Sequence, residues 1–132
     1  MSTKSIDAGL LLLRVGAAGF LLAVHGLPKL LNFSHELTVI DDPLGLGRGV
    51  TLILTLGAEI VAPVLIALGI VTRLACLPIL FLLLVSLLLV HPEWSVGEGQ
   101  FAWYLLLMFV TLTLTGPGAF ALGGRATRWW WQ

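Results

Sequence analysis

Four long apolar segments dominate the pattern of hydrophobic and polar residues along the chain. They run over about residues 6–31, 50–70, 74–90 and 100–115. A helix that crosses a bilayer needs about 20 mostly apolar residues, and each segment meets or approaches this length. Only Val71-Thr72-Arg73 separates the second segment from the third, which predicts a tight antiparallel hairpin, and Gly116-Pro117-Gly118 ends the fourth. The pattern therefore predicts an all-α integral membrane protein, with residues 1–132 forming a single domain, a four-transmembrane-helix antiparallel bundle.

Composition supports the same class of protein. Of the 132 residues, 58% are hydrophobic and 11% are charged, and the mean hydropathy is +1.04. A soluble domain carries about 25% charged residues, and a chain of this length cannot bury so much apolar surface in a water-soluble core. The formal net charge is zero, so no nucleic-acid partner is indicated, and the lipid membrane is the expected partner. The single cysteine, Cys76, excludes an intramolecular disulfide and a Cys-x-x-Cys redox or zinc pair.

The basic residues indicate the orientation of the bundle, because Lys and Arg in short loops prefer the cytoplasmic side. With the N-terminus inside, the cytoplasmic basic residues are Lys4, Arg73, Arg125 and Arg128. Those of the outer side are Lys29 and Arg48. An N-in/C-in multi-pass protein is therefore favoured, in which Trp129–Trp131 anchor the C-terminus at the cytoplasmic interface.

Glu59 is an ionisable residue in the middle of the second apolar segment. A charge near the bilayer midplane costs about 2.5 kcal/mol or more, and it almost always faces the bundle interior or a cavity. Pro63 removes the helical donor for the carbonyl group of Glu59. The partner that we predict is Arg14 on the first helix, because a depth difference of about 5–8 Å, judged from helix rise, is within reach of its side chain. Such a pair would either pin two helices together or serve a pocket.

The other polar residues form stripes that we expect to face one another. Thr51, Thr55 and Glu59 are spaced by four and share a face of the second helix. Arg14, His25 and Lys29 share a face of the first helix. The sequence therefore predicts an outward-facing pocket between the helices. Its candidate catalytic residues are Glu59, His25 and His91, its candidate substrate-binding residues are Arg14, Lys29, Thr51, Thr55 and Tyr104, and no metal ligands are assigned.

Several short motifs follow one another along the chain in a recognisable order. They are Leu13-Arg14-Val15, Gly19-Phe20, His25-Gly26-Leu27-Pro28-Lys29, Gly57-Ala58-Glu59-Ile60, the hairpin Leu68–Ala75, His91 and the stretch Leu114–Leu122. In this order and spacing, over about residues 10–122, the chain resembles the DoxX family of small four-helix membrane proteins. Family members often have a serine and an aspartate after the Gly-Pro-Gly turn, where this chain has Phe120-Ala121-Leu122-Gly123. Any role of that aspartate is therefore absent here.

The resemblance implies a bacterial or archaeal inner-membrane protein with a link to quinones. The family takes its name from a subunit associated with a terminal quinol oxidase, and a related branch is similar to the large subunit of thiosulfate:quinone oxidoreductase. The function that we expect is a subunit or accessory of a quinone-linked redox system, and an oxidoreductase subunit if the protein is an enzyme. No intrinsic cofactor is expected, since the chain has no Cys-rich cluster motif and no Rossmann glycine pattern. Quinone is the candidate ligand, and electrons would come from substrate or from a redox partner subunit.

Three other functions fit the same residues. A non-enzymatic scaffold or docking subunit would use the loop of residues 32–49. Haem or metal binding would use His25 and His91 as ligands, although the usual expectation for a lone histidine pair is no metal. A small-molecule carrier would be a homo-oligomer, for which Gly16, Gly19 and Ala23 offer a close-packing face.

Overall fold

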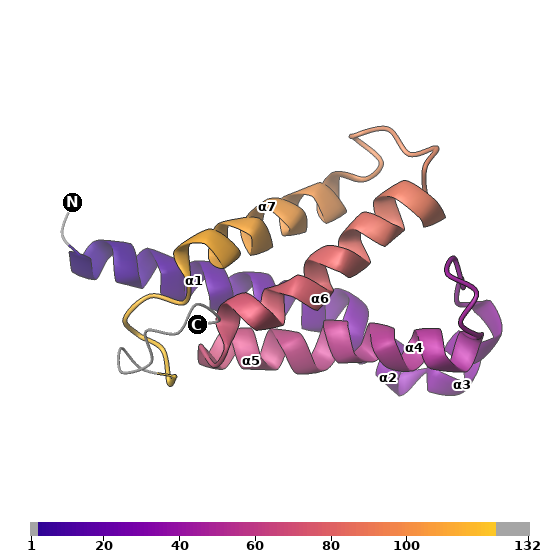
Figure 1. The fold of residues 1–132 in the computed structure, drawn as a ribbon, viewed down its shortest axis with the longest axis horizontal. Helices are drawn as coiled ribbons and strands as arrows, with labels where there is room; N and C mark the ends of the chain where they lie inside the picture. Colours follow the sequence, from indigo (N-terminus) through magenta and orange to yellow (C-terminus); the bar gives the residue numbers. More distant parts are fainter. Residues whose placement is uncertain (1–2, 124–132) are drawn as a thin grey trace.

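A computed structural model describes residues 3–123 as a set of packed helices (Figure 1). The first long helix comprises α1 (Thr3–Leu21), the π-helical turn η1 (Leu22–Gly26) and α2 (Leu27–Leu31), and a short helix α3 (Phe33–Val39) follows it. The second long helix comprises α4 (Arg48–Leu56), the π-helical turn η2 (Gly57–Val61) and α5 (Ala62–Leu68). The third comprises α6 (Thr72–Val85) and the π-helical turn η3 (Ser86–Val90), and the fourth is α7 (Gln100–Thr115). The described part of the chain contains no strand.

The four predicted apolar segments are confirmed as helices, with ends that differ from the predicted ones by a few residues. Thr3–Leu31, Arg48–Leu68 and Thr72–Val90 are each long and apolar enough to cross a membrane, whereas Gln100–Thr115 is a shorter apolar helix. The helix α3 was not predicted from the sequence, and it occupies part of the expected loop of residues 32–49. The residues Arg125, Arg128 and Trp129–Trp131, used above for orientation, lie outside the described residues.

Apolar side chains cover the outside of the bundle as well as filling its core. Leu12, Leu88 and Leu114 are 76%, 62% and 74% exposed, on α1, η3 and α7. Such surface is unfavourable in water by about 25 cal/mol per Å², but it carries no such cost against lipid tails. The core is formed by side chains from every long helix, including Leu21, Ile66, Ile79, Phe109 and Leu112. This exterior is that of a membrane protein.

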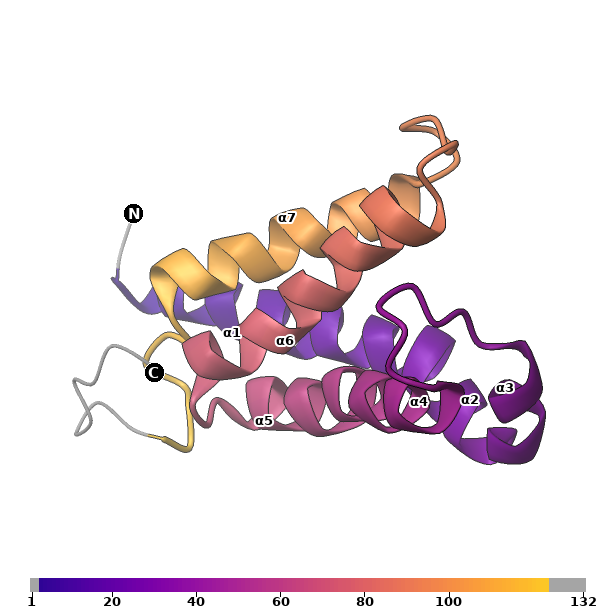
Figure 2. The same cartoon turned by 45° about the vertical axis from the view of Figure 1, so that its right-hand side comes forward.

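The helices pack closely at one end of the bundle and diverge at the other. At the closed end, α1 contacts α5 and α7, and α6 also contacts α5 and α7. From there α6 runs away from α4, as both views show (Figures 1 and 2). The loop of residues 40–47 and the helices α2 and α3 lie at the diverging end. This divergence creates the space for the site described below.

The segment that follows α7 folds back onto the turn between α5 and α6. The backbone N–H of Leu122 donates to the carbonyl oxygen of Leu68 at 3.0 Å, and that of Gly123 donates to Gly69 at 3.1 Å. Gly69 has a φ of 72°, which favours glycine. A Cβ at this position would lie 2.9 Å from the Cα of Ala121. The turn therefore needs glycine both for its backbone conformation and for the close approach of the C-terminal segment.

Candidate functional site

A cavity of about 750 Å³ lies between the diverging helices. Its walls come from the end of α1, from η1 and α2, from α4 and η2, from α6 and η3, from the start of α7, and from the loops of residues 40–47 and 91–99. Most of the lining side chains are apolar. Six of the eight candidate residues line it, namely His25, Lys29, Thr51, Thr55, Glu59 and His91. Side chains from three long helices therefore meet at one site, as a pocket requires.

Lys29 and Glu59 form an ion pair at this cavity. The Nζ of Lys29 donates to Oε1 of Glu59 at 3.0 Å and to Oε2 at 2.8 Å. The Glu59 side chain is 6% exposed and that of Lys29 is 21% exposed, so both groups are largely withdrawn from the surface. An ammonium group has three N–H donors, and this geometry leaves one of them for a ligand or water.

A close approach of two backbones brings this pair together. Gly26 is buried one helical turn before Lys29. A Cβ on Gly26 would clash with the carbonyl oxygen of Glu59 and would lie 2.9 Å from Cγ1 of Ile60. The carbonyl group that Pro63 deprives of its helical donor thus faces Gly26. Only a residue without a side chain allows the first and second helices to come this close, which places Lys29 within reach of Glu59.

The predicted pairing of Arg14 with Glu59 is wrong. Arg14 is 2% exposed and lies at the closed end of the bundle, where its guanidinium donates to three backbone carbonyl groups. Nε donates to Ala67 at 3.3 Å, Nη1 donates to Pro117 at 2.7 Å, and Nη2 donates to Phe120. Ala67 is in the last turn of α5, where carbonyl groups lack helical partners and favour a cation. Arg14 therefore joins the first helix to the C-terminal segment and does not line the cavity.

The structure also leaves Tyr104 away from the cavity. Its side chain is on α7 and is 54% exposed, and its hydroxyl group pairs with the side-chain amide of Gln100. The helical spacing used to group the polar residues gives the face of each helix, but it does not say which face turns inward. Of the eight candidates, Arg14 and Tyr104 are the two that lie elsewhere.

Three π-helical turns are found at the positions that carry the candidate catalytic residues. His25 is in η1, Glu59 is in η2, and His91 directly follows η3. In each case the wide turn is closed by a hydrogen bond to the residue five earlier: Leu27 to Leu22, Ala62 to Gly57 and His91 to Ser86. The next residue in each case is a proline, Pro28, Pro63 or Pro92. Because the proline ring clashes with the carbonyl group four residues earlier, the wider turn relieves the clash, and π turns often occur at functional sites.

The two histidines present flat rings to the cavity. His25 is half-buried, with its ring centroid 5.4 Å from that of Phe101. His91 stacks on Trp94 with a centroid separation of 3.7 Å and an interplanar angle of 2°, and its Nδ1 lies 3.7 Å from Oε1 of Glu93. Within residues 3–123, no group of three or more His, Cys, Asp or Glu side chains is arranged to hold a metal ion.

Asp42 is a structural residue of the site that the sequence analysis did not single out. Its Oδ1 accepts from the hydroxyl of Thr51 at 2.7 Å and from the N–H of Leu46 at 3.0 Å, and its Oδ2 accepts from the N–H of Gly47 at 2.8 Å. These contacts, led by that of Thr51, hold the pKa of the Asp42 carboxyl below its ordinary value. The loop of residues 40–47 is thereby fastened to α4 above the cavity. An Asp-Pro step followed by glycines is a signal for such a turn.

These features define a small, multi-pass helical membrane protein with an ion pair inside the bundle. A family model described as DoxX matches residues 9–92, which is more than half of the chain, and the protein belongs to the DoxX family. The matched region includes all six candidate residues that line the cavity, and it ends before α7. No curated protein and no solved structure matches the chain.

Proposed function

We propose that this protein binds a quinone in the cavity, as a subunit or accessory of a quinone-linked redox system in a bacterial or archaeal inner membrane. In this proposal all four long helices cross the membrane, both termini are cytoplasmic, and the cavity lies toward the outer side. The observation that carries the proposal is the meeting of the Lys29–Glu59 pair with His25 and His91 at one largely apolar cavity. Membership of the DoxX family is in keeping with it.

The residues present fit the needs of a quinone head group. A bound quinone would supply a flat ring whose two carbonyl groups take up electrons and protons. Lys29 retains one N–H donor for such a carbonyl group, and an imidazole N–H of His25 or His91 offers a second. The rings of Phe101 and Trp94, which contact these histidines, add aromatic surface to the cavity.

Proton transfer at this site would use the chain's own ionisable groups. Histidine exchanges protons near neutral pH, and Glu59 is in hydrogen-bond contact with Lys29. The sequence has no Cys-rich cluster motif and no Rossmann glycine pattern. Electrons would therefore reach the site from substrate or from a partner subunit.

The test is direct binding of quinone to the full-length protein in lipid nanodiscs. We expect saturable binding of a ubiquinone with a short tail, measured by isothermal titration calorimetry. His25→Ala should weaken this binding about tenfold or more, as expected when a polar contact in an apolar pocket is lost. Glu59→Gln should have a similar effect, because it removes the carboxylate that positions Lys29. His35→Ala is the matched control, because His35 is exposed on α3 and does not line the cavity. Absence of binding to the unchanged protein would refute the proposal.

A further inference from the structure

We infer that the cavity exchanges its ligand sideways with the membrane, through an opening between α4 and α6, and that this ligand has an uncharged head and an apolar tail. The inference rests on the proposed function in taking the cavity as a ligand site, and it adds the route and the chemical class of ligand. It is carried by three features of the cavity: its cover, its side wall and its charges.

The end of the cavity beyond α4 is covered by the loop of residues 40–47. Ile40, Pro43, Leu44 and Leu46 of this loop line the cavity, so the loop turns apolar side chains toward it. Asp42 fastens the loop to α4 through Thr51. Arg48 directly follows the loop of residues 40–47, and its Nη1 donates to the carbonyl oxygen of Thr38 at 2.8 Å. This hydrogen bond ties the C-terminal end of the loop to α3. A ligand that enters from water on this side would have to displace a loop held at both ends.

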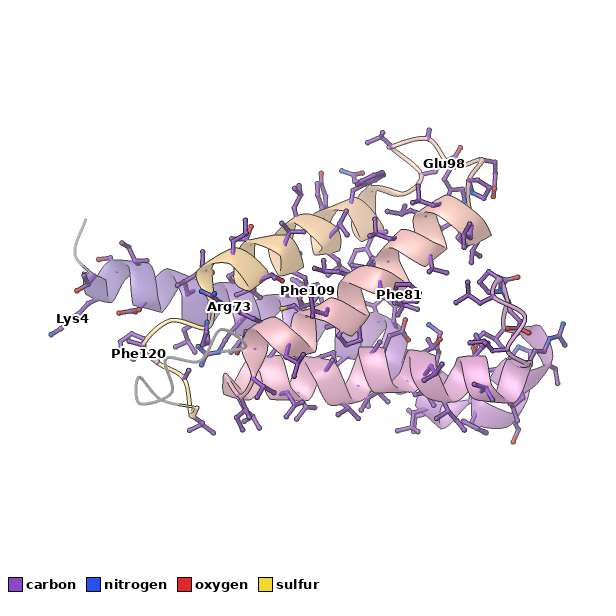
Figure 3. The ribbon with its side chains drawn as sticks, in the orientation of Figure 1. Lys4, Arg73, Phe81, Glu98, Phe109 and Phe120 are labelled. Atoms are coloured by element: carbon purple, nitrogen blue, oxygen red, sulfur yellow. The ribbon has the colours of Figure 1, made fainter. Side chains whose placement is uncertain are left out.

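On the side of the cavity between α4 and α6, two of the lining side chains are apolar and are also exposed on the outside of the bundle. Leu54 on α4 and Phe81 on α6 both line the cavity, and each is 59% exposed. α6 packs on α5 at the closed end and diverges from α4 beyond it (Figure 2). Phe81 is located where this divergence begins (Figure 3). Because the outside here faces lipid tails, the opening leads from the cavity into the membrane.

The charges at the cavity disfavour an anionic ligand. Among the described residues that line it, Lys29 is the only lysine or arginine, whereas Asp41, Glu59 and Glu98 are carboxylates. The charge of Lys29 is already matched by Glu59 at 2.8 Å. An anion would meet net negative charge, and a charged head of either sign would lose its hydration in crossing the apolar opening. An uncharged head with hydrogen-bond acceptors meets neither cost, and an apolar tail remains in contact with lipid.

The first experiment measures entry through the opening. Full-length protein in lipid nanodiscs is mixed with an azido-ubiquinone that has a long isoprenoid tail, and covalent labelling is followed against mixing time by mass spectrometry. Leu54→Trp and Phe81→Trp narrow the opening and should slow labelling on the order of tenfold. Ile53→Trp and Leu88→Trp are the matched controls, because Ile53 and Leu88 are 63% and 62% exposed on the same two long helices but do not line the cavity. Their labelling rates should equal that of the unchanged protein.

The outcomes separate the inference from the proposed function. If the unchanged protein is labelled and the substitutions at Leu54 and Phe81 act no differently from the controls, the sideways route is wrong while quinone binding stands. If a short-tailed, water-soluble azido-ubiquinone is slowed equally by Leu54→Trp and Phe81→Trp, the effect is on the site and not on the route, which also overturns the inference. If no quinone labels the unchanged protein, the proposed function fails and the second experiment decides the route.

The second experiment needs no quinone. Nanodiscs are doped with a long-chain alcohol that carries a diazirine in its chain, or with the fatty acid of the same length at pH 8. The alcohol should label Leu83 and Leu105, which line the cavity and are 7% and 1% exposed. Leu54→Trp and Phe81→Trp should reduce this labelling, and the fatty acid should give less of it than the alcohol. Labelling confined to lipid-facing positions such as Leu88, or equal labelling by both probes, would overturn the inference.

Discussion

Lys29 donates from one ammonium group to both carboxylate oxygens of Glu59, at 3.0 and 2.8 Å, across the interface between the first and second helices. Gly26 makes this contact possible, because a side chain at that position would collide with the backbone of Glu59. The glycine thus sets the separation of the two helices, and this separation brings Lys29 within hydrogen-bond distance of Glu59.

Removing the charge of Lys29 alone should lower the free energy of unfolding more than removing the charges of both Lys29 and Glu59. Lys29→Met leaves the buried Glu59 carboxylate without its cation, and we expect a loss of about 3–5 kcal/mol in the free energy of unfolding. The double variant Lys29→Met with Glu59→Gln should regain a large part of this loss, because no unpaired charge remains. Denaturant titration in detergent micelles measures both. The control is Glu93→Gln, which removes an exposed partner of His91 and should change the free energy of unfolding by less than about 1 kcal/mol. Equal effects of Lys29→Met and Glu93→Gln would contradict the prediction.

Gly26→Ala should separate the first two helices at the cavity. The new methyl group has no room against the carbonyl oxygen of Glu59, so the helices move apart and the distance from Lys29 to Glu59 increases. We expect lower stability, by about 1–3 kcal/mol for an overpacked contact, together with weaker quinone binding. At Gly19 a Cβ meets nothing within 4 Å, so Gly19→Ala should be neutral or stabilising by up to about 1 kcal/mol. If both substitutions behave alike in thermal unfolding, the close approach at Gly26 is not required.

Arg14→Ala should loosen the C-terminal segment without weakening ligand binding. The substitution removes the guanidinium donors of the carbonyl groups of Ala67, Pro117 and Phe120. We expect the free energy of unfolding to fall by about 3 kcal/mol or more. Amide hydrogen exchange at Leu122 and Gly123 should rise, because their bonds to Leu68 and Gly69 depend on the docked segment. Arg48→Ala is the control, since it removes a single exposed contact to Thr38. Loss of quinone binding in folded Arg14→Ala would place Arg14 in the site after all.

The loop over the cavity should open in acid. The folded-state pKa of Asp42 is lowered chiefly by the Thr51 hydroxyl and the Gly47 amide, so the carboxylate stabilises the loop at pH values above its ordinary pKa of about 4, and this contribution is lost as pH falls through the lower folded value. A spin label at Leu44→Cys, in a Cys76→Ala background, should become mobile only in that acid range. Asp42→Asn should make the label mobile at neutral pH, whereas Asp41→Asn should not. A label that stays immobile in Asp42→Asn would show that other contacts hold the loop.

The apolar pattern predicted where the helices lie but not how they are set against one another. Gly26 is opposite Glu59, so Arg14, twelve residues earlier on the first helix, is about 18 Å away along the helix axis at 1.5 Å per residue. No arginine side chain spans that distance, which is why the predicted Arg14–Glu59 pair is wrong. Lys29, which was predicted to bind substrate and not to pair with Glu59, is one turn beyond the contact of the two backbones and reaches the carboxylate instead. The axial offset between the first and second helices depends on where their backbones can approach each other closely. The spacing of apolar residues along each helix does not predict that point.

The remaining differences between the predicted and the observed site arise from local backbone and side-chain contacts. Pro63 indicated a freed carbonyl group at Glu59, and the structure has a π turn there, but a proline does not by itself select a π turn over a kink. The roof of the cavity depends on the Asp42–Thr51 contact, which joins residues nine apart in a stretch with no helical period. His25, Thr55, Glu59 and His91 were predicted to share a pocket, and the structure places all four at one cavity.

The contacts of Arg14 also have a consequence for how the chain is made. Its hydrogen-bond acceptors at Pro117 and Phe120 are 103 and 106 residues further along the chain, so the ribosome adds them well after the first helix. At about 5–20 residues per second, the first helix exists for roughly 5–20 s before those carbonyl groups are synthesised. Until then Ala67 is the one of these three acceptors that is present, and the guanidinium must stay hydrated at the membrane surface or be shielded by the insertion machinery. A chain released after Thr115 is therefore expected to insert but to remain open to protease, because Arg14 then lacks two of these three acceptors.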